Sequence, residues 1–209
     1  MTNEWTNPDH ALAYLERLSS IPHRDEGEAT LISEISPDAE RILDLGCGNG
    51  HLLALLLAHC PGATGVGLDL SSTMLDEAKQ RFADNQRVTL IQHNLDLPLP
   101  ELGSFDVTAS SFAIHHCTDQ RKRTLYQEIW EILEPGGVFG NLEHVASPTD
   151  AIHRRFLEAM NCRPADEDPS NKLLDVQTQL TWLREIGFED VDCYWQWREL
   201  ALLAGRNPS

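Results

Sequence analysis

Gly46, Gly48 and Gly50 occupy every second position between an apolar run, residues 42–45, and an apolar stretch with helical character. A strand, a glycine turn and a helix in this order present backbone N–H groups and a helix N-terminus to a ligand. Glycine suits such a turn because it permits positive φ values and lets a ligand approach the backbone closely. The segment therefore predicts a site for a nucleotide-type cofactor.

Asp69 ends the next predicted strand, nineteen residues after Gly50. A carboxylate at this distance can accept hydrogen bonds from both hydroxyls of a ribose. A dinucleotide fingerprint requires G-x-G-x-x-G, but the position of the third glycine is held by His51 or Leu53, depending on the glycine from which it is counted. The spacing therefore disfavours a dinucleotide.

The segment D-x-G-x-G-x-G at 44–50 resembles the first motif of class I S-adenosylmethionine (SAM)-dependent methyltransferases. Residues 93–95 resemble the family's third motif, residues 104–116 its fourth strand and following loop, and residues 133–139 its turn into the fifth strand. The resemblance implies SAM as cofactor and S-adenosylhomocysteine (SAH) as product. Asn94 stands where the family usually has an acid that meets the adenine amino group, and an amide oxygen can also accept that bond. The expected cofactor residues, with Arg24 added as a partner for the cofactor's carboxylate, are Asp44, Leu45, Gly46, Cys47, Gly48, Asn49, Gly50, Asp69, Leu70, Met74, Asn94, Leu95, Ser111 and Arg24.

His115 and His116 follow the fourth predicted strand, and Glu143 with His144 ends the fifth. Methyl transfer requires alignment of a nucleophile and, for a hydroxyl, removal of its proton. His116 or His115 is a candidate base, because imidazole titrates near neutrality, and Glu143 is a candidate to hold a histidine or the acceptor. The alternative is a histidine with a purely structural hydrogen bond. No metal site is expected, because adjacent side chains at a strand end point in opposite directions.

Apolar runs with strand character alternate with helical periods along the chain. The expected strands are 41–45, 65–69, 88–92, 105–110, 138–143, 188–195 and 199–204, and the expected core helices are 52–59, 73–83, 120–133, 150–160 and 176–186. This alternation predicts an α/β fold with a single doubly wound, Rossmann-like sheet of seven mainly parallel strands. The last two strands are close enough to form a C-terminal antiparallel hairpin.

One domain is expected over residues 1–209, with no linker or repeat. Two helical patterns, 9–18 and 26–36, lie within residues 1–40, which form either a helical lid over the cofactor edge or a packing arm. Residues 145–175 form an inserted helix and loop near the acceptor pocket.

The formal net charge of −17 disfavours nucleic acid as a partner, since nonspecific binding to phosphates depends on lysine and arginine. The one basic cluster, residues 121–123, is expected on a solvated helix face. Five scattered cysteines indicate reduced thiols, and no apolar run could span a membrane. The N-terminus lacks signal-peptide features, so a cytoplasmic location is expected. The expected oligomeric state is a monomer or homodimer.

These features predict a SAM-dependent methyltransferase that acts on oxygen, nitrogen or sulfur of a small-molecule acceptor. Two alternatives stay open. One is a SAM-binding relative that remodels SAM or modifies tRNA, and the other is a SAM-binding partner protein without catalysis.

Overall fold

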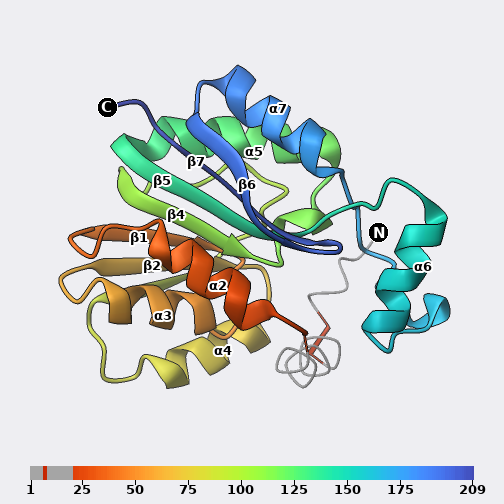
Figure 1. Cartoon of the computed structure of the whole chain (residues 1–209). Helices are drawn as coiled ribbons and strands as arrows, with labels where there is room; N and C mark the ends of the chain where they lie inside the picture. The colour runs from red at the N-terminus through yellow and green to blue at the C-terminus, as the bar shows by residue number, and fades with distance from the viewer. Residues whose placement is uncertain (1–6, 9–20) are drawn as a thin grey trace.

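The computed structural model describes residues 7, 8 and 21–209, and its centre is a seven-stranded sheet in the order β3-β2-β1-β4-β5-β7-β6 (Figure 1). Strands β1 to β5 are parallel, and β7 pairs antiparallel with both β5 and β6. The expected fold class, including the C-terminal hairpin, is confirmed. The strands are β1 (Arg41–Leu45), β2 (Thr64–Asp69), β3 (Val88–Gln92), β4 (Phe105–Ser111), β5 (Leu133–His144), β6 (Glu189–Trp197) and β7 (Leu200–Arg206).

The strand order reverses between β1 and β4, because the chain first builds outward from β1 to β3 and then returns to the other side of β1. In open α/β sheets, ligands bind beside the carboxyl ends of the strands at such a switch point. The glycine loop follows β1 directly, so it lies at this place.

Helices cover both faces of the sheet. Figure 1 shows α2, α3 and α4 on one face and α5 and α7 on the other, with α6 beyond the carboxyl ends of the strands. Their bounds are α2 (Arg24–Ser33), α3 (His51–His59), α4 (Ser72–Arg81), α5 (Asp119–Ile132), α6 (Asp150–Ala159) and α7 (Val176–Ile186).

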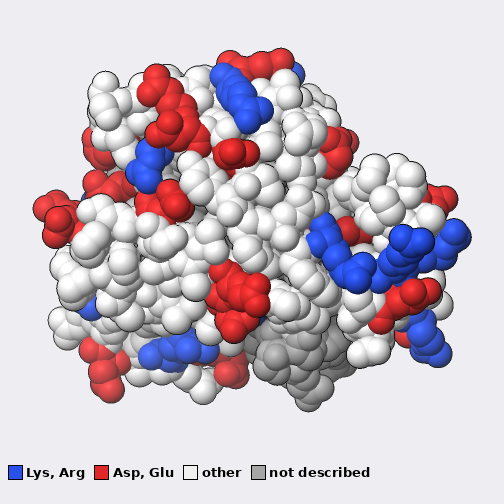
Figure 2. Space-filling model, in the orientation of Figure 1, with Lys and Arg blue, Asp and Glu red and all other residues white. Residues whose placement is uncertain are grey.

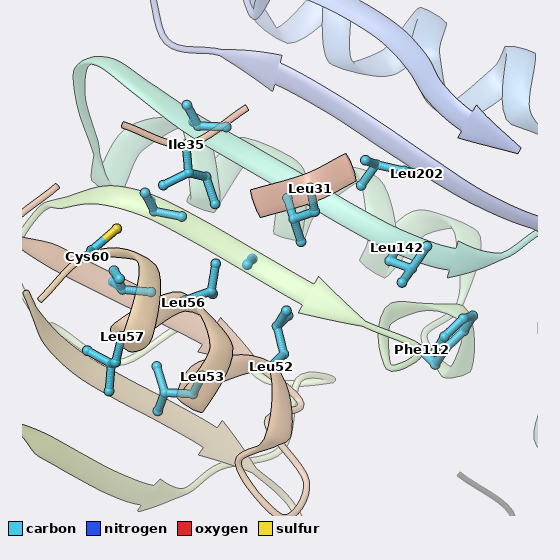
Figure 3. Close-up of a cluster of buried hydrophobic side chains, with 14 of the residues drawn as sticks. Leu31, Ile35, Leu52, Leu53, Leu56, Leu57, Cys60, Phe112, Leu142 and Leu202 are labelled. Atoms are coloured by element: carbon cyan, nitrogen blue, oxygen red, sulfur yellow. The ribbon is translucent and has the colours of Figure 1, made fainter. Parts of the chain in front are cut away.

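The core on the first face joins α2 and α3 to the sheet (Figure 3). Leu53 and Leu56 of α3 and Leu31 of α2 are fully buried. Each fully buried leucine of this kind contributes about 1.5–3 kcal/mol relative to an exposed one. This packing holds α3, and therefore the loop that precedes it, against β1.

The described part of the N-terminal extension is a packing helix. Helix α2 lies against the sheet, where Leu31 packs so closely over Gly140 that an added Cβ there would be 2.1 Å from Leu31 Cδ1. Only the first turn of α2, with Arg24, reaches the strand ends. The other predicted helix of the lid, 9–18, lies outside the described residues.

The expectation of a solvated face for the basic cluster was wrong for two of its three residues. Lys122 is fully buried and its Nζ donates to the carbonyl of Lys172. The side chain of Arg121 is 11% exposed, and only Arg123, which pairs with Glu185, lies on the surface. Helix α5 buries this edge because the loop before β4 and the loop after α6 both pack on it.

Within the described residues, no helix is long and apolar enough to cross a membrane. Cys47, Cys60, Cys117 and Cys193 are free thiols.

Candidate functional site

The loop after β1 has the conformation for which its glycines were expected. Gly46, Gly48 and Gly50 all have positive φ values, 68°, 52° and 76°. The N–H of Cys47 donates to the carbonyl of Leu68 at 2.9 Å, which ties the loop to β2. A Cβ added to Gly48 would meet no protein atom within 4 Å, so this backbone faces open space. The loop therefore exposes backbone to a ligand at Gly48.

Beside the loop, Asp44 is 1% exposed, and neither of its carboxylate oxygens has a hydrogen-bond partner. Burial, followed by the negative charge of Asp69, raises the pKa of Asp44 to about 8. The backbone N–H of Leu53 favours the charged form but makes no hydrogen bond to either oxygen. A buried carboxylate without donors is costly, and a positively charged ligand group would offset that cost.

Asp69, at the end of β2, is held by the backbone. Its Oδ2 accepts from the N–H of Gly48 and its Oδ1 from the N–H of Ser71, both at 2.8 Å. Burial raises its pKa, while these two bonds favour the charged form. Each carboxylate oxygen has a further lone pair, so Asp69 is oriented and can still accept from ligand hydroxyls.

One cavity collects most of the expected cofactor residues. Its lining includes Arg24, Asp44, Gly46, Cys47, Gly48, Asn49, Asp69, Leu70, Met74, Asn94, Leu95 and Ser111. Two expected residues lie outside the lining: Leu45 is in the core, and Gly50 caps α3 against Phe82. Sequence reasoning missed other lining residues, namely His51, Leu52, His93, Asp96, Phe112, Ala113 and Cys117.

The wall formed by residues 94–99 is fixed from α5. The guanidinium of Arg121 donates to the carbonyls of Leu95 and Leu97 and forms a two-nitrogen pair with Glu128. Glu128 in turn accepts from the N–H of Leu99 at 3.0 Å. We call the Arg121–Glu128 pair the clamp. Both of its side chains are long and flexible, and paired, charge-assisted bonds hold them in place.

Within the same wall, the amide oxygen of Asn94 accepts from the N–H of Asp96 at 3.0 Å. This bond closes a local turn and uses one of the two lone pairs of that oxygen. Asp96 also borders the cavity, so a carboxylate stands two residues after the position where the sequence placed the amide.

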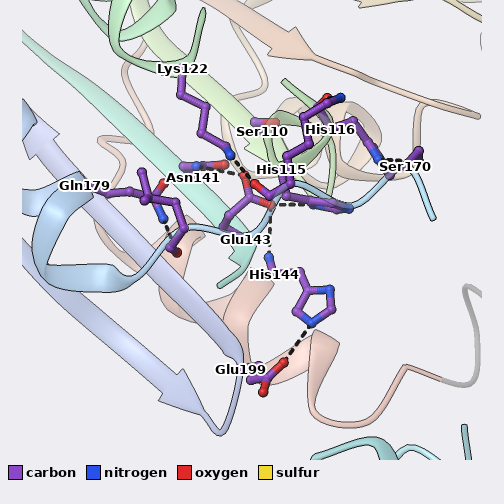
Figure 4. Close-up of polar contacts among 12 residues, drawn as sticks. Ser110, His115, His116, Lys122, Asn141, Glu143, His144, Ser170, Gln179 and Glu199 are labelled. Atoms are coloured by element: carbon purple, nitrogen blue, oxygen red, sulfur yellow. Dashed lines mark hydrogen bonds and ion pairs between the residues drawn. The ribbon is translucent and has the colours of Figure 1, made fainter. Parts of the chain in front are cut away.

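The two adjacent histidines have different surroundings (Figure 4). His115 is 6% exposed, and its Nδ1 lies 2.6 Å from Oε1 of Glu143, which also accepts from the backbone N–H of His144. His116 borders the cavity, whereas His115 and Glu143 do not. The ring centroids of His115 and His116 are 4.0 Å apart. Glu143 thus reaches a histidine, but the histidine farther from the cavity.

His116 is supported by the loop after α6. Its Nδ1 lies 2.9 Å from Oγ of Ser170, and that hydroxyl donates to Oδ1 of Asp168 at 2.7 Å. Because the single hydroxyl proton goes to Asp168, the ring must donate from Nδ1. In the neutral ring the lone pair is then on Nε2.

Electrostatics keep both imidazoles neutral. Burial lowers the pKa of His115, with His144 adding to the effect, and burial with the neighbouring His115 lowers the pKa of His116 to about 3. Burial raises the pKa of Glu143 to about 7, despite the bonds from His144 and Asn141. Protonation of this group of residues is therefore set by burial more than by their pairing.

Glu199, in the turn between β6 and β7, is a second buried carboxylate that sequence reasoning missed. It accepts from Ser147 and lies 3.1 Å from Nε2 of His144 and 3.0 Å from Nδ1 of His153. These bonds tie α6 to the hairpin. Within residues 7, 8 and 21–209, no three His, Cys, Asp or Glu side chains are placed to hold a metal ion.

Known proteins match both the sequence and the fold. A family model described as a methyltransferase domain matches residues 42–137. Demethylmenaquinone methyltransferase of Clavibacter sepedonicus is 29% identical over 169 residues, covering 73% of this chain and 67% of that protein. Trans-aconitate 2-methyltransferase of Deinococcus radiodurans is 35% identical over 156 residues, covering 74% of this chain and 55% of that protein. An O-methyltransferase family protein from Burkholderia thailandensis has the same fold, with a TM-score of 0.76 at 21% identity over 99% of this chain and 62% of that one.

The fold and the cavity define a doubly wound α/β protein whose switch point holds a cavity bordered by the glycine loop and Asp69. The matches narrow this class: residues 42–137 match a methyltransferase domain, and the chain is similar in sequence and fold to class I SAM-dependent methyltransferases. SAM is the cofactor of this family, and structures with the same fold hold SAM or SAH. The chain spans between 47% and 67% of the length of the first curated relatives it matches.

Proposed function

We propose that this protein transfers the methyl group of SAM to oxygen, nitrogen or sulfur of a small molecule. One observation carries the proposal. The exposed backbone of Gly48, the oriented carboxylate of Asp69 and the partnerless carboxylate of Asp44 all border one cavity at the carboxyl ends of β1 and β2.

The lining offers a partner for each part of SAM. Asp69 can accept from the ribose hydroxyls, and the wall with Asn94 and Leu95 suits the adenine ring. Asp44 supplies the charge that an ammonium group requires, and Arg24 the charge that a carboxylate requires. When bound, SAM supplies a methyl group on a sulfonium, which is open to in-line attack. The work of the chain is to bind, to align and to exclude water.

On the acceptor side, His116 is the catalytic candidate, because it borders the cavity. The low pKa of His116 keeps its ring neutral but makes it a weak base. This favours a hydrogen bond to an acceptor hydroxyl, with the proton passing to the ring as the new bond forms. His115 and Glu143 take a positioning role in this proposal, since they pack behind His116 and do not border the cavity.

The surface supports a small acceptor over a nucleic acid. Figure 2 shows Asp and Glu side chains spread over the face in view, with several Lys and Arg side chains near α6 and others scattered over the rest of that face. The exposed arginines there, Arg154, Arg155 and Arg163, alternate along the chain with Asp150, Glu158 and Asp166. On the face in view, the described residues therefore form no continuous basic surface that would follow a phosphate backbone. The names of the curated relatives also specify small acceptors.

The proposal includes a cytoplasmic location, which the free thiols of Cys47, Cys60, Cys117 and Cys193 favour, and a monomer or homodimer. SAM-remodelling chemistry, tRNA modification and binding without catalysis are the alternatives that the experiment must separate.

The test combines binding with turnover. In thermal-shift assays, SAM and SAH should raise the Tm and NAD should not, since only the first two fit the glycine loop. Release of SAH is then measured against a panel of quinols, carboxylic acids, phenols, amines and thiols. SAM-dependent methylation of one class supports the proposal. Stabilisation by NAD alone would overturn the cofactor assignment, and SAM binding without SAH release across the panel and with tRNA would favour the non-catalytic alternative.

A further inference from the structure

Glu28 is a buried carboxylate that lies between two residues of the cavity lining. It belongs to α2 and is 3% exposed. Its Oε1 accepts from Nε of Arg24 at 2.7 Å, and its Oε2 lies 3.1 Å from Nε2 of His51. Arg24 and His51 border the cavity, and Glu28 does not. The carboxylate therefore stands behind the lining and holds two of its members.

The position of α2 does not require this charge. Leu31 is fully buried against the sheet, and Gly27 lets the helix approach Leu142 and Trp195 so closely that an added Cβ would be 2.7 Å from Leu142 Cδ1. Burying a carboxylate among these apolar contacts has a desolvation cost. The charge-assisted bonds to Arg24 and His51 offset that cost, so the local benefit of Glu28 is the placement of those two side chains.

The charge state of Glu28 suits this task. Burial raises its pKa, but the hydrogen bond with His51 and the charge of Arg24 together lower it more, so the pKa of Glu28 lies below its usual range. Glu28 is ionised at neutral pH. The guanidinium of Arg24 is thus held through Nε, and its terminal nitrogens still carry donors for a second carboxylate.

Glu28 also explains why Asp44 is unpaired. Arg24 and Asp44 border the same cavity, and a guanidinium near a buried carboxylate is expected to pair with it. Such a pair would neutralise the two charges that an amino-acid zwitterion needs. Arg24 bonds instead to Glu28 and lies 6.0 Å from the ring centroid of Phe112, while both oxygens of Asp44 remain without a partner.

We infer that Glu28 is a positioning residue that directs Arg24, with His51, toward the amino-acid group of the cofactor and keeps Arg24 from pairing with Asp44. This inference rests on the proposed function, since it assumes SAM or SAH in the cavity. It assigns Glu28 an effect on one end of the ligand only.

The experiment compares SAH with 5′-methylthioadenosine, which keeps the adenine, ribose and sulfur but lacks the amino-acid group. Isothermal titration calorimetry of the full chain measures both dissociation constants. Glu28→Gln should raise the dissociation constant of SAH by about tenfold or more, the size of one charge-assisted contact. It should change the dissociation constant of methylthioadenosine by less than about twofold. Glu26→Gln, on the exposed side of the same helix, is the matched control and should change neither.

A double-mutant cycle separates positioning from a general structural effect. If Glu28 acts through Arg24, then Glu28→Gln adds little to the loss of SAH affinity already caused by Arg24→Gln. Should Glu28→Gln not fold, as judged by circular dichroism, Glu28→Asp withdraws the charge by one methylene and gives the same readout.

Four outcomes overturn the inference. Unchanged SAH affinity in Glu28→Gln, or an equal loss for both ligands, refutes positioning of the amino-acid end while leaving the proposed function intact. Full additivity with Arg24→Gln refutes action through Arg24. Failure of the wild-type chain to bind SAH overturns the proposed function and the inference with it.

Discussion

The carboxylates of Asp44 and Asp69 border one cavity from the ends of neighbouring strands, yet only Asp69 has hydrogen-bond donors from the protein. Asp69 is therefore oriented before any ligand arrives, whereas Asp44 is left with a desolvated carboxylate and a raised pKa. The first arrangement suits ligand hydroxyls. The buried carboxylate of Asp44 is destabilised by desolvation, and a cationic ligand group would stabilise it.

Asp44→Asn should raise the free energy of unfolding at alkaline pH and abolish the release of a proton on SAH binding. In the free protein the pKa of Asp44 is about 8, well above its usual value, so the folded state holds a proton that the unfolded chain has lost. The free energy of unfolding therefore falls as pH rises between these two values. The variant removes this dependence, and its Tm should exceed that of the wild type at pH 8 by about 2–4 °C per kcal/mol regained.

The same variant should bind SAH at least about tenfold more weakly, because the ammonium loses its charged partner. Wild-type protein should release nearly one proton on binding SAH at pH 7, and Asp44→Asn should release none. Calorimetry in buffers of different ionisation enthalpy counts these protons. Asp76→Asn, at an exposed position on α4, is the control, and identical proton counts in wild type and Asp44→Asn would contradict the assignment.

Asp69→Ala should weaken the binding of SAH and of methylthioadenosine equally, by about tenfold to a hundredfold, because both ligands carry the ribose. Asp69→Asn retains one acceptor oxygen and should show a smaller loss. A fluorescence or calorimetric titration with each ligand checks this. A loss confined to SAH would place Asp69 at the amino-acid end instead.

Alanine at Gly48 and at Gly50 should separate ligand binding from folding. Both glycines have positive φ, so alanine costs about 1–2 kcal/mol at either position. At Gly50 the new Cβ would also be 2.4 Å from Phe82 Cε2, whereas at Gly48 it would enter open cavity. Thermal melts should show the larger destabilisation for Gly50→Ala, and calorimetry the larger loss of SAH affinity per degree of lost Tm for Gly48→Ala. The reverse order would show that the ligand does not approach Gly48.

The sequence predicted the elements that depend on local pattern. Strands β1 and β3 and helix α7 have the expected bounds, because each is an apolar or periodic run between clear turn residues. Strand β5 begins at Leu133 and not at Val138, since Leu133 pairs with Phe105 across an irregularity in β4. That pairing is a tertiary contact, which no local pattern contains.

The site was predictable to the same extent. The glycine loop and Asp69 follow from spacing, and twelve of the expected cofactor residues border the cavity. Ser170 reaches His116 across 54 positions of sequence, and Glu28 reaches His51 across 23. These partners come from a loop and a helix whose placement depends on packing. The buried state of Lys122 escaped prediction for the same reason, because a basic triplet alone looks solvated.

Breaking the clamp on the wall of residues 94–99 should loosen that wall without unfolding the sheet. Arg121→Lys keeps the charge but loses the two-nitrogen contact with Glu128 and the carbonyl bonds of the guanidinium. We expect faster hydrogen exchange at the amide of Leu99, which Glu128 binds, and a loss of SAH affinity of about threefold to tenfold. Arg123→Lys, at the exposed neighbouring position, is the matched control. Unchanged exchange at Leu99 would show that the wall is held by other contacts.

The two histidines should respond differently to removal, because one supports the site and the other borders it. His115→Ala leaves Glu143 buried without its 2.6 Å hydrogen-bond partner. Leaving a buried polar group unsatisfied costs about 1–3 kcal/mol, so this variant should be destabilised in thermal or urea melts. His116→Ala loses a contact with Ser170 at the cavity edge and should be destabilised less. With a hydroxyl acceptor from the panel, His116→Ala should lower kcat by about 100-fold while the SAH dissociation constant stays within about twofold. This is the low end of what general bases contribute, because the low pKa of His116 makes it a weak base. Ser170→Ala removes the acceptor of the Nδ1 proton and should give a smaller fall in kcat.

Full activity of His116→Ala on the hydroxyl substrate would move proton removal to another group or to water. An equal fall in kcat for His115→Ala in a folded protein would place the two rings in one catalytic unit.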